Sequence, residues 1–208
     1  LEYGKLALLY GDSGQGKSTV LSILSGVIPN VTKGTLSGEI RVGGEDVSGQ
    51  RISDICRRAG VVLQNADAQI IHQRVEDELA FGCENMGMPE DEIFSRVDEA
   101  ARELNIEKLL GRSIFELSGG EKQKISCASV SALRPEVMVL DEPTSNLDLQ
   151  AIEELKQTLL AWKAEGKTIV IAEHRLSWLK EICDRVICMR DGEVDFDIPM
   201  TEFERYSA

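Results

Sequence analysis

The sequence has no long apolar run, and this absence argues against a membrane span of its own. Its longest apolar stretches, such as 137–140 and 169–172, have the length of strands, whereas a spanning helix needs about 18 apolar residues. No secretory signal is visible in residues 1–5, which read LEYGK. With 208 residues, 42% of them hydrophobic and 28% charged, the chain is expected to form one large globular domain, or one core with a small insert.

Positive charge and paired cysteines are also scarce. The chain has 23 Lys and Arg residues against 36 Asp and Glu, and its net charge is −13. This balance argues against a nucleic-acid partner, because polyanions are bound through clustered cations. The five cysteines form no Cys-x-x-Cys pair, so we expect reduced, mostly buried thiols in a cytosolic protein and no metal at Cys183 and Cys188.

What the sequence does contain is an alternation of short apolar segments with helical ones. Such alternation predicts an α/β fold with a mostly parallel sheet. The stretch 74–112 is polar, rich in Glu and broken at 86–89, which indicates an inserted helical arm. The segment 39–42 alternates in polarity and predicts a small antiparallel piece. The strands predicted for the main sheet are 6–10, 60–63, 137–140, 168–172, 185–189 and 193–196.

A phosphate-binding loop is predicted at residues 11–19. They read GDSGQGKST and fit the pattern G-x-x-x-x-G-K-[ST] between a predicted strand and a predicted helix. Lys17 is expected to reach the β- and γ-phosphates of a nucleotide, and the Ser18 hydroxyl to bind Mg²⁺. A chance Gly-rich turn is the alternative, which the flanking strand and helix disfavour. The residues predicted to bind the nucleotide here are Gly11, Ser13, Gly14, Gly16, Lys17, Ser18 and Thr19.

Two acids follow the apolar strand at 137–140, at the edge where open α/β sheets bind ligands. Asp141 is expected to hold Mg²⁺, directly or through water. Glu142 lies one residue further and can orient an attacking water as general base. Two acids after a strand are common, and a helix-capping pair is the alternative.

Residues 117–122 read LSGGEK and predict a second anion site, one without its own lysine. Ser118 and Glu121 have the spacing of a capping box, so a helix is predicted to begin there and to run toward Leu133. The N–H groups of Gly119 and Gly120 and the helix dipole favour an anion. An ordinary Ser-capped helix is the alternative.

In their order, and over nearly the whole chain, these motifs resemble an ATP-binding-cassette (ABC) ATPase. The resemblance implies a P-loop NTPase (RecA-like) core at 1–73 and 134–208, with a helical subdomain carrying the signature at 74–133, in a single nucleotide-binding domain 1–208. Gln64 matches the family's glutamine loop, Asp148 the loop that contacts the opposite subunit, and His174 the histidine on the γ-phosphate. His72, the other histidine, is expected to be structural.

The resemblance also implies a Mg²⁺-dependent ATPase in which two cassettes bind head to tail. ATP then lies between the phosphate loop of one cassette and the signature of the other. The implied cofactors are ATP and Mg²⁺. The residues implied for catalysis are Glu142, His174, Gln64 and Lys17; for the metal, Ser18, Gln64 and Asp141; and for ATP in the facing cassette, Ser118, Gly119, Gly120 and Asp148.

The segments 64–70 and 75–89 are similar to the ATPases of energy-coupling-factor importers of vitamins and of cobalt or nickel ions, although that group usually has Pro at the position of Ala66. Segments 34–39 and 173–176 resemble tandem members with two cassettes in one chain. The implied partners are a second cassette (an identical copy, a paralogue or a same-chain tandem) and a transmembrane coupling subunit, at the cytoplasmic face of the membrane. The alternatives are another class of importer ATPase, a soluble ABC ATPase of translation, DNA repair or chromosome maintenance, or a non-catalytic binding module.

The chain departs from the family before the phosphate loop. Only ten residues precede Gly11, where the family has an antiparallel strand pair and an aromatic residue that stacks on adenine. We expect these N-terminal strands to be missing because the sequence is trimmed from a longer protein, and ATP binding by this piece to be weak. Tyr3 is predicted to pack at a strand edge instead.

Overall fold

The computed structural model describes residues 1–206, and its centre is a six-stranded sheet. The strands lie in the order β4-β5-β6-β1-β7-β8. All neighbouring pairs are parallel except β7 and β8, which form the predicted hairpin. The strands are β1 (Leu6–Tyr10), β4 (Ala59–Val62), β5 (Val137–Asp141), β6 (Thr168–Ala172), β7 (Arg185–Arg190) and β8 (Glu193–Pro199).

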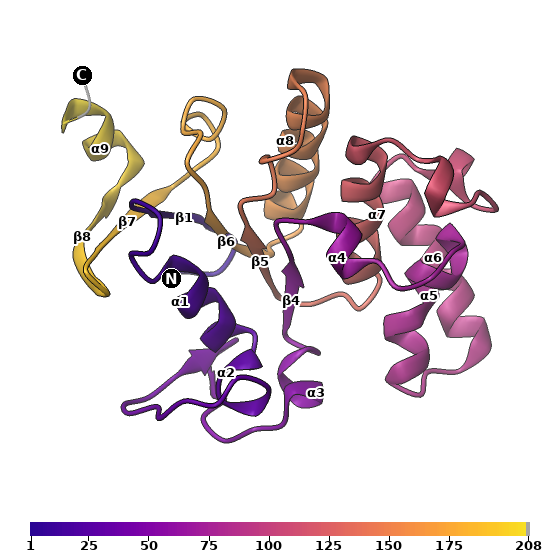
Figure 1. Cartoon of the computed structure of the whole chain (residues 1–208), viewed down its shortest axis with the longest axis horizontal. Helices are drawn as coiled ribbons and strands as arrows, with labels where there is room; N and C mark the ends of the chain where they lie inside the picture. Colours follow the sequence, from indigo (N-terminus) through magenta and orange to yellow (C-terminus); the bar gives the residue numbers. More distant parts are fainter. Residues whose placement is uncertain (207–208) are drawn as a thin grey trace.

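Helices cover both faces of this sheet, which explains why its central strands are apolar throughout. Helix α1 (Lys17–Leu24) places Leu21 against Leu9 on one face. On the other face, α8 (Leu149–Ala164) places Trp162 in the cluster that contains Leu8. Figure 1 shows α1 and α8 on opposite sides of the strands. The predicted α/β fold with a mostly parallel sheet is therefore confirmed, and the sheet lies between two layers of helices.

Three helices form a separate group at the β4 end of the sheet, here named the helical lobe (Figure 1). They are α5 (Val75–Asn85), α6 (Glu90–Glu103) and α7 (Gly119–Ser131), with short 3₁₀ turns at Glu107–Leu109 and Ile114–Glu116. The break predicted at 86–89 separates α5 from α6. The three helices lie within the predicted subdomain 74–133, whose exact limits stay a prediction.

The remaining elements are short. The predicted antiparallel piece consists of β2 (Arg41–Val42) and β3 (Glu45–Asp46). Of the segment 39–42, only its last two residues form a strand. Three one-turn helices were not predicted, nor was the C-terminal helix. They are α2 (Val27–Asn30), α3 (Ile52–Ile55), α4 (Ala66–Gln69) and α9 (Met200–Tyr206).

One local prediction is wrong. Tyr3 does not pack at a strand edge: it lies in a turn before β1, and 66% of it is exposed. The signature helix runs toward Leu133 as predicted, with its last helical residue at Ser131. Arg134 then adopts a left-handed conformation (φ 52°) before Pro135, which cannot continue the helix. The cysteines are all free, and four of the five are buried, as expected.

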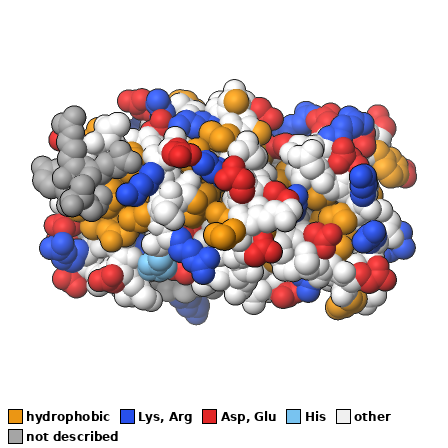
Figure 2. All heavy atoms as spheres, turned by 90° about the horizontal axis from the view of Figure 1, so that it is seen from above, with side chains coloured by type: hydrophobic (Ala, Val, Ile, Leu, Met, Phe, Trp, Pro, Cys, Tyr) orange, Lys and Arg blue, Asp and Glu red, His pale blue; other side chains and the backbone are white. Residues whose placement is uncertain are grey.

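Helix length and the distribution of surface charge also bear on the sequence predictions. No helix among residues 1–206 is long and apolar enough to cross a membrane. Figure 2 shows Lys and Arg side chains interspersed with Asp and Glu over the face that it displays, so the described residues of that face present no extended patch of one sign.

Candidate nucleotide site

The strand order brings four predicted segments to one edge of the sheet. Strands β4, β5, β6 and β1 are parallel neighbours, so their carboxyl ends lie together. Gln64 follows β4, Asp141 ends β5, His174 follows β6, and the phosphate loop follows β1. Open α/β sheets bind ligands at this edge.

The phosphate loop is shaped by its glycines and closed by its lysine. Gly11 has φ 149°, and a Cβ there would lie 2.5 Å from the carbonyl oxygen of Met189 in β7, so only glycine fits. The Lys17 ammonium donates hydrogen bonds to the carbonyl oxygens of Gly11 (2.7 Å) and Asp12 (2.9 Å), and only 4% of the residue is exposed. The loop thus holds a buried cation at its centre, beside the N-terminus of α1.

The other predicted residues of the loop lie around this cation. Ser13 and Gly14 are at its tip, Gly16 precedes α1 in a left-handed conformation (φ 95°), and Ser18 and Thr19 are in the first turn of the helix. No side chain caps α1. Its first N–H groups are therefore not taken up by a capping side chain and are available to an anion.

Asp141 has the environment of a cation ligand. One of its carboxylate oxygens, Oδ1, is buried and has no hydrogen-bond partner in the described part of the chain. Burial raises the pKa of Asp141, although a hydrogen bond from Ser18 and the charge of Lys17 act in the opposite direction. A buried carboxylate with a free oxygen beside a hydroxyl is a donor set that suits Mg²⁺, so Asp141 and Ser18 fit the predicted metal.

Glu142 lies at the centre of a short hydrogen-bonded chain. Its carboxylate accepts from Gln64 Nε2 (3.0 Å) and contacts His174 Nε2 at 2.7 Å. Its backbone is left-handed, with φ 44°, which is unfavourable for a residue with a side chain. The backbone N–H of Glu142 donates to Ala172 at the end of β6, which holds this conformation. Three of the residues predicted to be catalytic are thereby in contact.

Glu173 is a functional candidate that the sequence analysis missed. It is 2% exposed, and one carboxylate oxygen accepts from the backbone N–H groups of His174 (2.8 Å) and Arg175 (3.1 Å). Its other oxygen accepts from the hydroxyl of Thr144, in the loop that follows Glu142. Glu173 therefore fixes the two loops that carry His174 and Glu142. The sequence signal that could have identified Glu173 is its position as a charged residue directly after the apolar strand β6.

The signature segment has the predicted local structure. Ser118 caps α7, and the reciprocal capping box with Glu121 is complete, so the helix begins at Gly119. Asp148 caps α8 by accepting from Ala151 N (2.8 Å). Ser118, Gly119, Gly120 and Asp148 line one open hollow of about 540 Å³.

This hollow is separate from the phosphate loop of the same chain. None of the loop residues 11–19 lines it, and Figure 1 shows α4 and the sheet between α1 and α7. The two predicted halves of an ATP site are therefore both formed in one chain but are not brought together in it.

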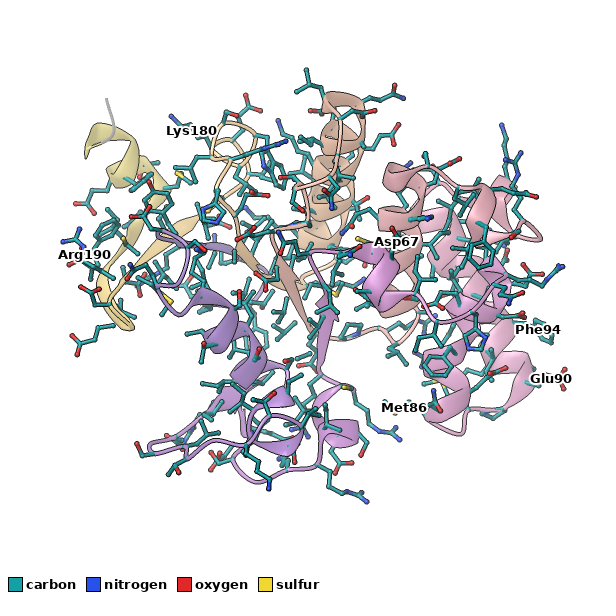
Figure 3. The ribbon with its side chains drawn as sticks, in the orientation of Figure 1. Asp67, Met86, Glu90, Phe94, Lys180 and Arg190 are labelled. Atoms are coloured by element: carbon teal, nitrogen blue, oxygen red, sulfur yellow. The ribbon has the colours of Figure 1, made fainter. Side chains whose placement is uncertain are left out.

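One ion pair joins the segment after Gln64 to the signature helix. Asp67 of α4 pairs with Lys122 in the first turns of α7 at 2.7 Å, and Figure 3 shows Asp67 on the side of α4 toward the helical lobe. Gln69 holds the same segment to β4 through hydrogen bonds with Leu63 N (2.8 Å) and Val61 O (3.2 Å). His72 packs against Phe81, with ring centroids 5.0 Å apart and the ring planes tilted by 56°.

Comparisons with known proteins agree with this geometry. A family model described as "ABC transporter" matches residues 1–145. A putative ABC transporter ATP-binding protein of Treponema denticola is 42% identical over 200 residues, which cover 96% of this chain and 41% of that protein. A protein of the same description from Saccharolobus solfataricus is 39% identical over 202 residues, covering 97% and 38%. The chain thus spans about two fifths of the length of these curated relatives.

A solved structure is also similar. It is cbiO1 from Clostridium perfringens, described as part of the ABC transporter complex cbiONQ. The TM-score is 0.89 with 31% identity, and the match covers 100% of this chain and 82% of that one.

Proposed function

Because this chain belongs to the ABC transporter family, we propose that it is an ATP-binding cassette that hydrolyses MgATP to power transport through a membrane partner. The observation that carries the proposal is the contact of the Glu142 carboxylate with the side chains of Gln64 and His174. These side chains lie at the same ligand-binding edge of the sheet as the buried Lys17. These are the groups that phosphoryl transfer to water requires: a cation on the phosphates and a positioned base.

Each residue has a defined task in this proposal. The phosphate loop binds the β- and γ-phosphates, with Lys17 exchanging its two carbonyl acceptors for phosphate oxygens. Glu142 orients the attacking water and receives its proton. His174 and Gln64 hold the carboxylate of Glu142 and contact the γ-phosphate and the water. Ser18, Asp141 and Gln64 would hold Mg²⁺, which supplies charge neutralisation when bound.

The second half of the ATP site is proposed to come from another cassette. Ser118, Gly119 and Gly120 form an anion site that is separate from Lys17 in the same chain. A head-to-tail pair of cassettes would place each signature, with Asp148, on the ATP held by the other phosphate loop. The second cassette is proposed to be an identical copy, a paralogue or a further part of the same polypeptide. ATP then stabilises the pair, and hydrolysis releases it.

The transport assignment rests on the likeness to a structure described as part of an ABC transporter complex. We propose that the cassette docks at the cytoplasmic face of the membrane, with a coupling helix of the transmembrane subunit lying against the Gln64 segment and the helical lobe. The proposed cargo is a small solute, a vitamin or a metal ion, moved inward. A soluble ABC ATPase of translation, DNA repair or chromosome maintenance is the second candidate.

The two candidates differ in what stimulates hydrolysis. The intact protein, tagged and extracted from membranes in mild detergent, should bring a transmembrane subunit with it. Its ATPase rate in liposomes with that subunit should exceed the rate of the protein alone, while Lys17→Ala should abolish both. Stimulation by DNA or ribosomes, with none by the membrane subunit, would replace the transport assignment by the soluble one.

A further inference from the structure

A cluster of polar side chains remote from the phosphate loop joins the helical lobe to the sheet. Glu103 is the last residue of α6, Ser131 is the last residue of α7, and Lys167 immediately precedes β6. The Ser131 hydroxyl donates to Glu103 Oε2 (2.7 Å), and the Lys167 ammonium contacts Glu103 Oε1 (3.3 Å) and Ser131 Oγ (3.2 Å). Three segments that are distant in sequence thus meet at one ammonium group.

The Lys167 ammonium group is surrounded by oxygen acceptors. Besides Glu103 and Ser131, it pairs with Glu165 at 3.1 Å, so its three N–H donors have three acceptors. Its nitrogen lies 5.5 Å from the ring centroid of the fully buried Trp162. The side chain of Lys167 is 11% exposed and that of Glu103 is 17% exposed. An ion pair so shielded is weakened less by water than an exposed surface pair.

The same end of α7 is also packed tightly against the sheet. Gly60 in β4 has no side chain, and a Cβ there would lie 2.3 Å from Val130 Cγ1 and 2.8 Å from Pro135 Cγ. Because α7 is a regular helix of 13 residues, it spans about 20 Å. Its orientation at Ser131 therefore sets the position of Ser118–Gly120 at its other end.

The hollow beside this cluster does not have the character of a ligand site. It has a volume of about 770 Å³, and its lining includes Arg96 and Arg134. Both arginines form ion pairs with acids of α6, Arg96 with Glu92 and Arg134 with Glu99. Charges that are already matched point to a structural connection between lobe and core.

We propose that Lys167, Glu103 and Ser131 are positioning residues that set the angle of α7 relative to the sheet and thereby place the signature on the facing cassette. This inference rests on the proposed function, since it concerns the half-site that α7 carries. The cluster touches neither ATP nor the phosphate loop. Its loss should weaken the two-cassette state and leave nucleotide binding by the phosphate loop unchanged.

The test measures ATP retained by the intact protein after rapid desalting in MgATP, in a Glu142→Gln background that does not turn over. Lys167→Met keeps the aliphatic stem on Trp162 and removes the charge, and Glu103→Gln removes the opposite charge. Each should lower retained ATP by roughly tenfold, the size expected for a coupled pair. ATP affinity at the phosphate loop, measured in EDTA under conditions where sizing chromatography shows the cassettes to be separate, should stay within about twofold of the parent.

Two controls separate positioning from general destabilisation. Asp98→Asn removes a carboxylate of the same helix whose partner, Arg102, is also in α6, and it should change nothing. Lys167→Arg, which keeps the positive charge beside Glu103 and Glu165, should preserve much of the retained ATP. Unchanged retention in both single variants, or a loss of EDTA affinity equal to the loss of retention, would overturn the positioning role. Failure of Glu142→Gln itself to retain ATP would refute the two-cassette function, and the role proposed here with it.

Discussion

Replacing Glu142 by glutamine should stop hydrolysis while leaving the fold intact. The carboxylate has two contacts, with Gln64 Nε2 at 3.0 Å and His174 Nε2 at 2.7 Å. An amide has the same shape: its oxygen can accept from Gln64, and its NH₂ can donate to a neutral His174. We therefore expect the free energy of unfolding to change by less than about 1 kcal/mol.

The rate should respond differently. A positioned general base contributes about 10²- to 10⁴-fold, which corresponds to about 3 to 5 kcal/mol of the barrier at roughly 1.4 kcal/mol per tenfold. Glu142→Gly provides an independent check, because glycine removes the strain of φ 44°, worth about 1–2 kcal/mol. That gain offsets the two lost hydrogen bonds, at about 1 kcal/mol each, so this variant should also be inactive at nearly unchanged stability.

The assay is single-turnover release of labelled phosphate from MgATP, with urea unfolding measured on the same preparations. Glu107→Gln, an exposed acid in a 3₁₀ turn, is the matched control and should retain full activity. A Glu142→Gln rate within threefold of the parent rate, at equal stability, would mean that Glu142 is not the base.

Three further variants test neighbouring parts of the site. Asp141→Asn should be more stable than the parent at pH 7, because burial raises the pKa of Asp141 and so penalises its charged form. Urea titrations should show that the difference in unfolding free energy between variant and parent shrinks as the pH falls toward that pKa. A variant less stable than the parent at pH 7 would contradict the raised pKa of Asp141. Gly11→Ala should cost roughly 1–3 kcal/mol and abolish ATP binding, measured by calorimetry, because its Cβ would meet Met189 O at 2.5 Å. Glu173→Gln should lower kcat about tenfold with KM unchanged, as expected when the loops of His174 and Glu142 loosen; a change confined to KM would argue against this positioning role.

Several features depended only on short-range pattern and could be predicted. The capping box of Ser118 and Glu121 involves residues three apart, and it is formed as expected. The loop at 11–19 and its helix follow from glycine freedom and the sheet edge. Tyr3 was predicted wrongly, because the packing of a residue before the first strand depends on what lies beside it and not on its own spacing.

The contacts between distant segments could not be predicted from spacing. That Glu142 joins Gln64 and His174 follows from the adjacency of β4, β5 and β6, and the left-handed backbone at Glu142 depends on its bond to Ala172. Glu173 and Lys167 were not singled out at all, because each acts through partners on other elements.

By itself, the sequence determined the class of fold, the phosphate loop, the two acids, the signature helix and their order. These properties reside in short segments whose hydrophobic period and turn chemistry act over a few residues. Only the tertiary structure decided which strand ends meet, that the signature hollow lies apart from its own phosphate loop, and that the Lys167 ammonium ties α6 and α7 to the sheet. Those outcomes depend on strand order and helix packing, which bring together residues that local pattern cannot relate.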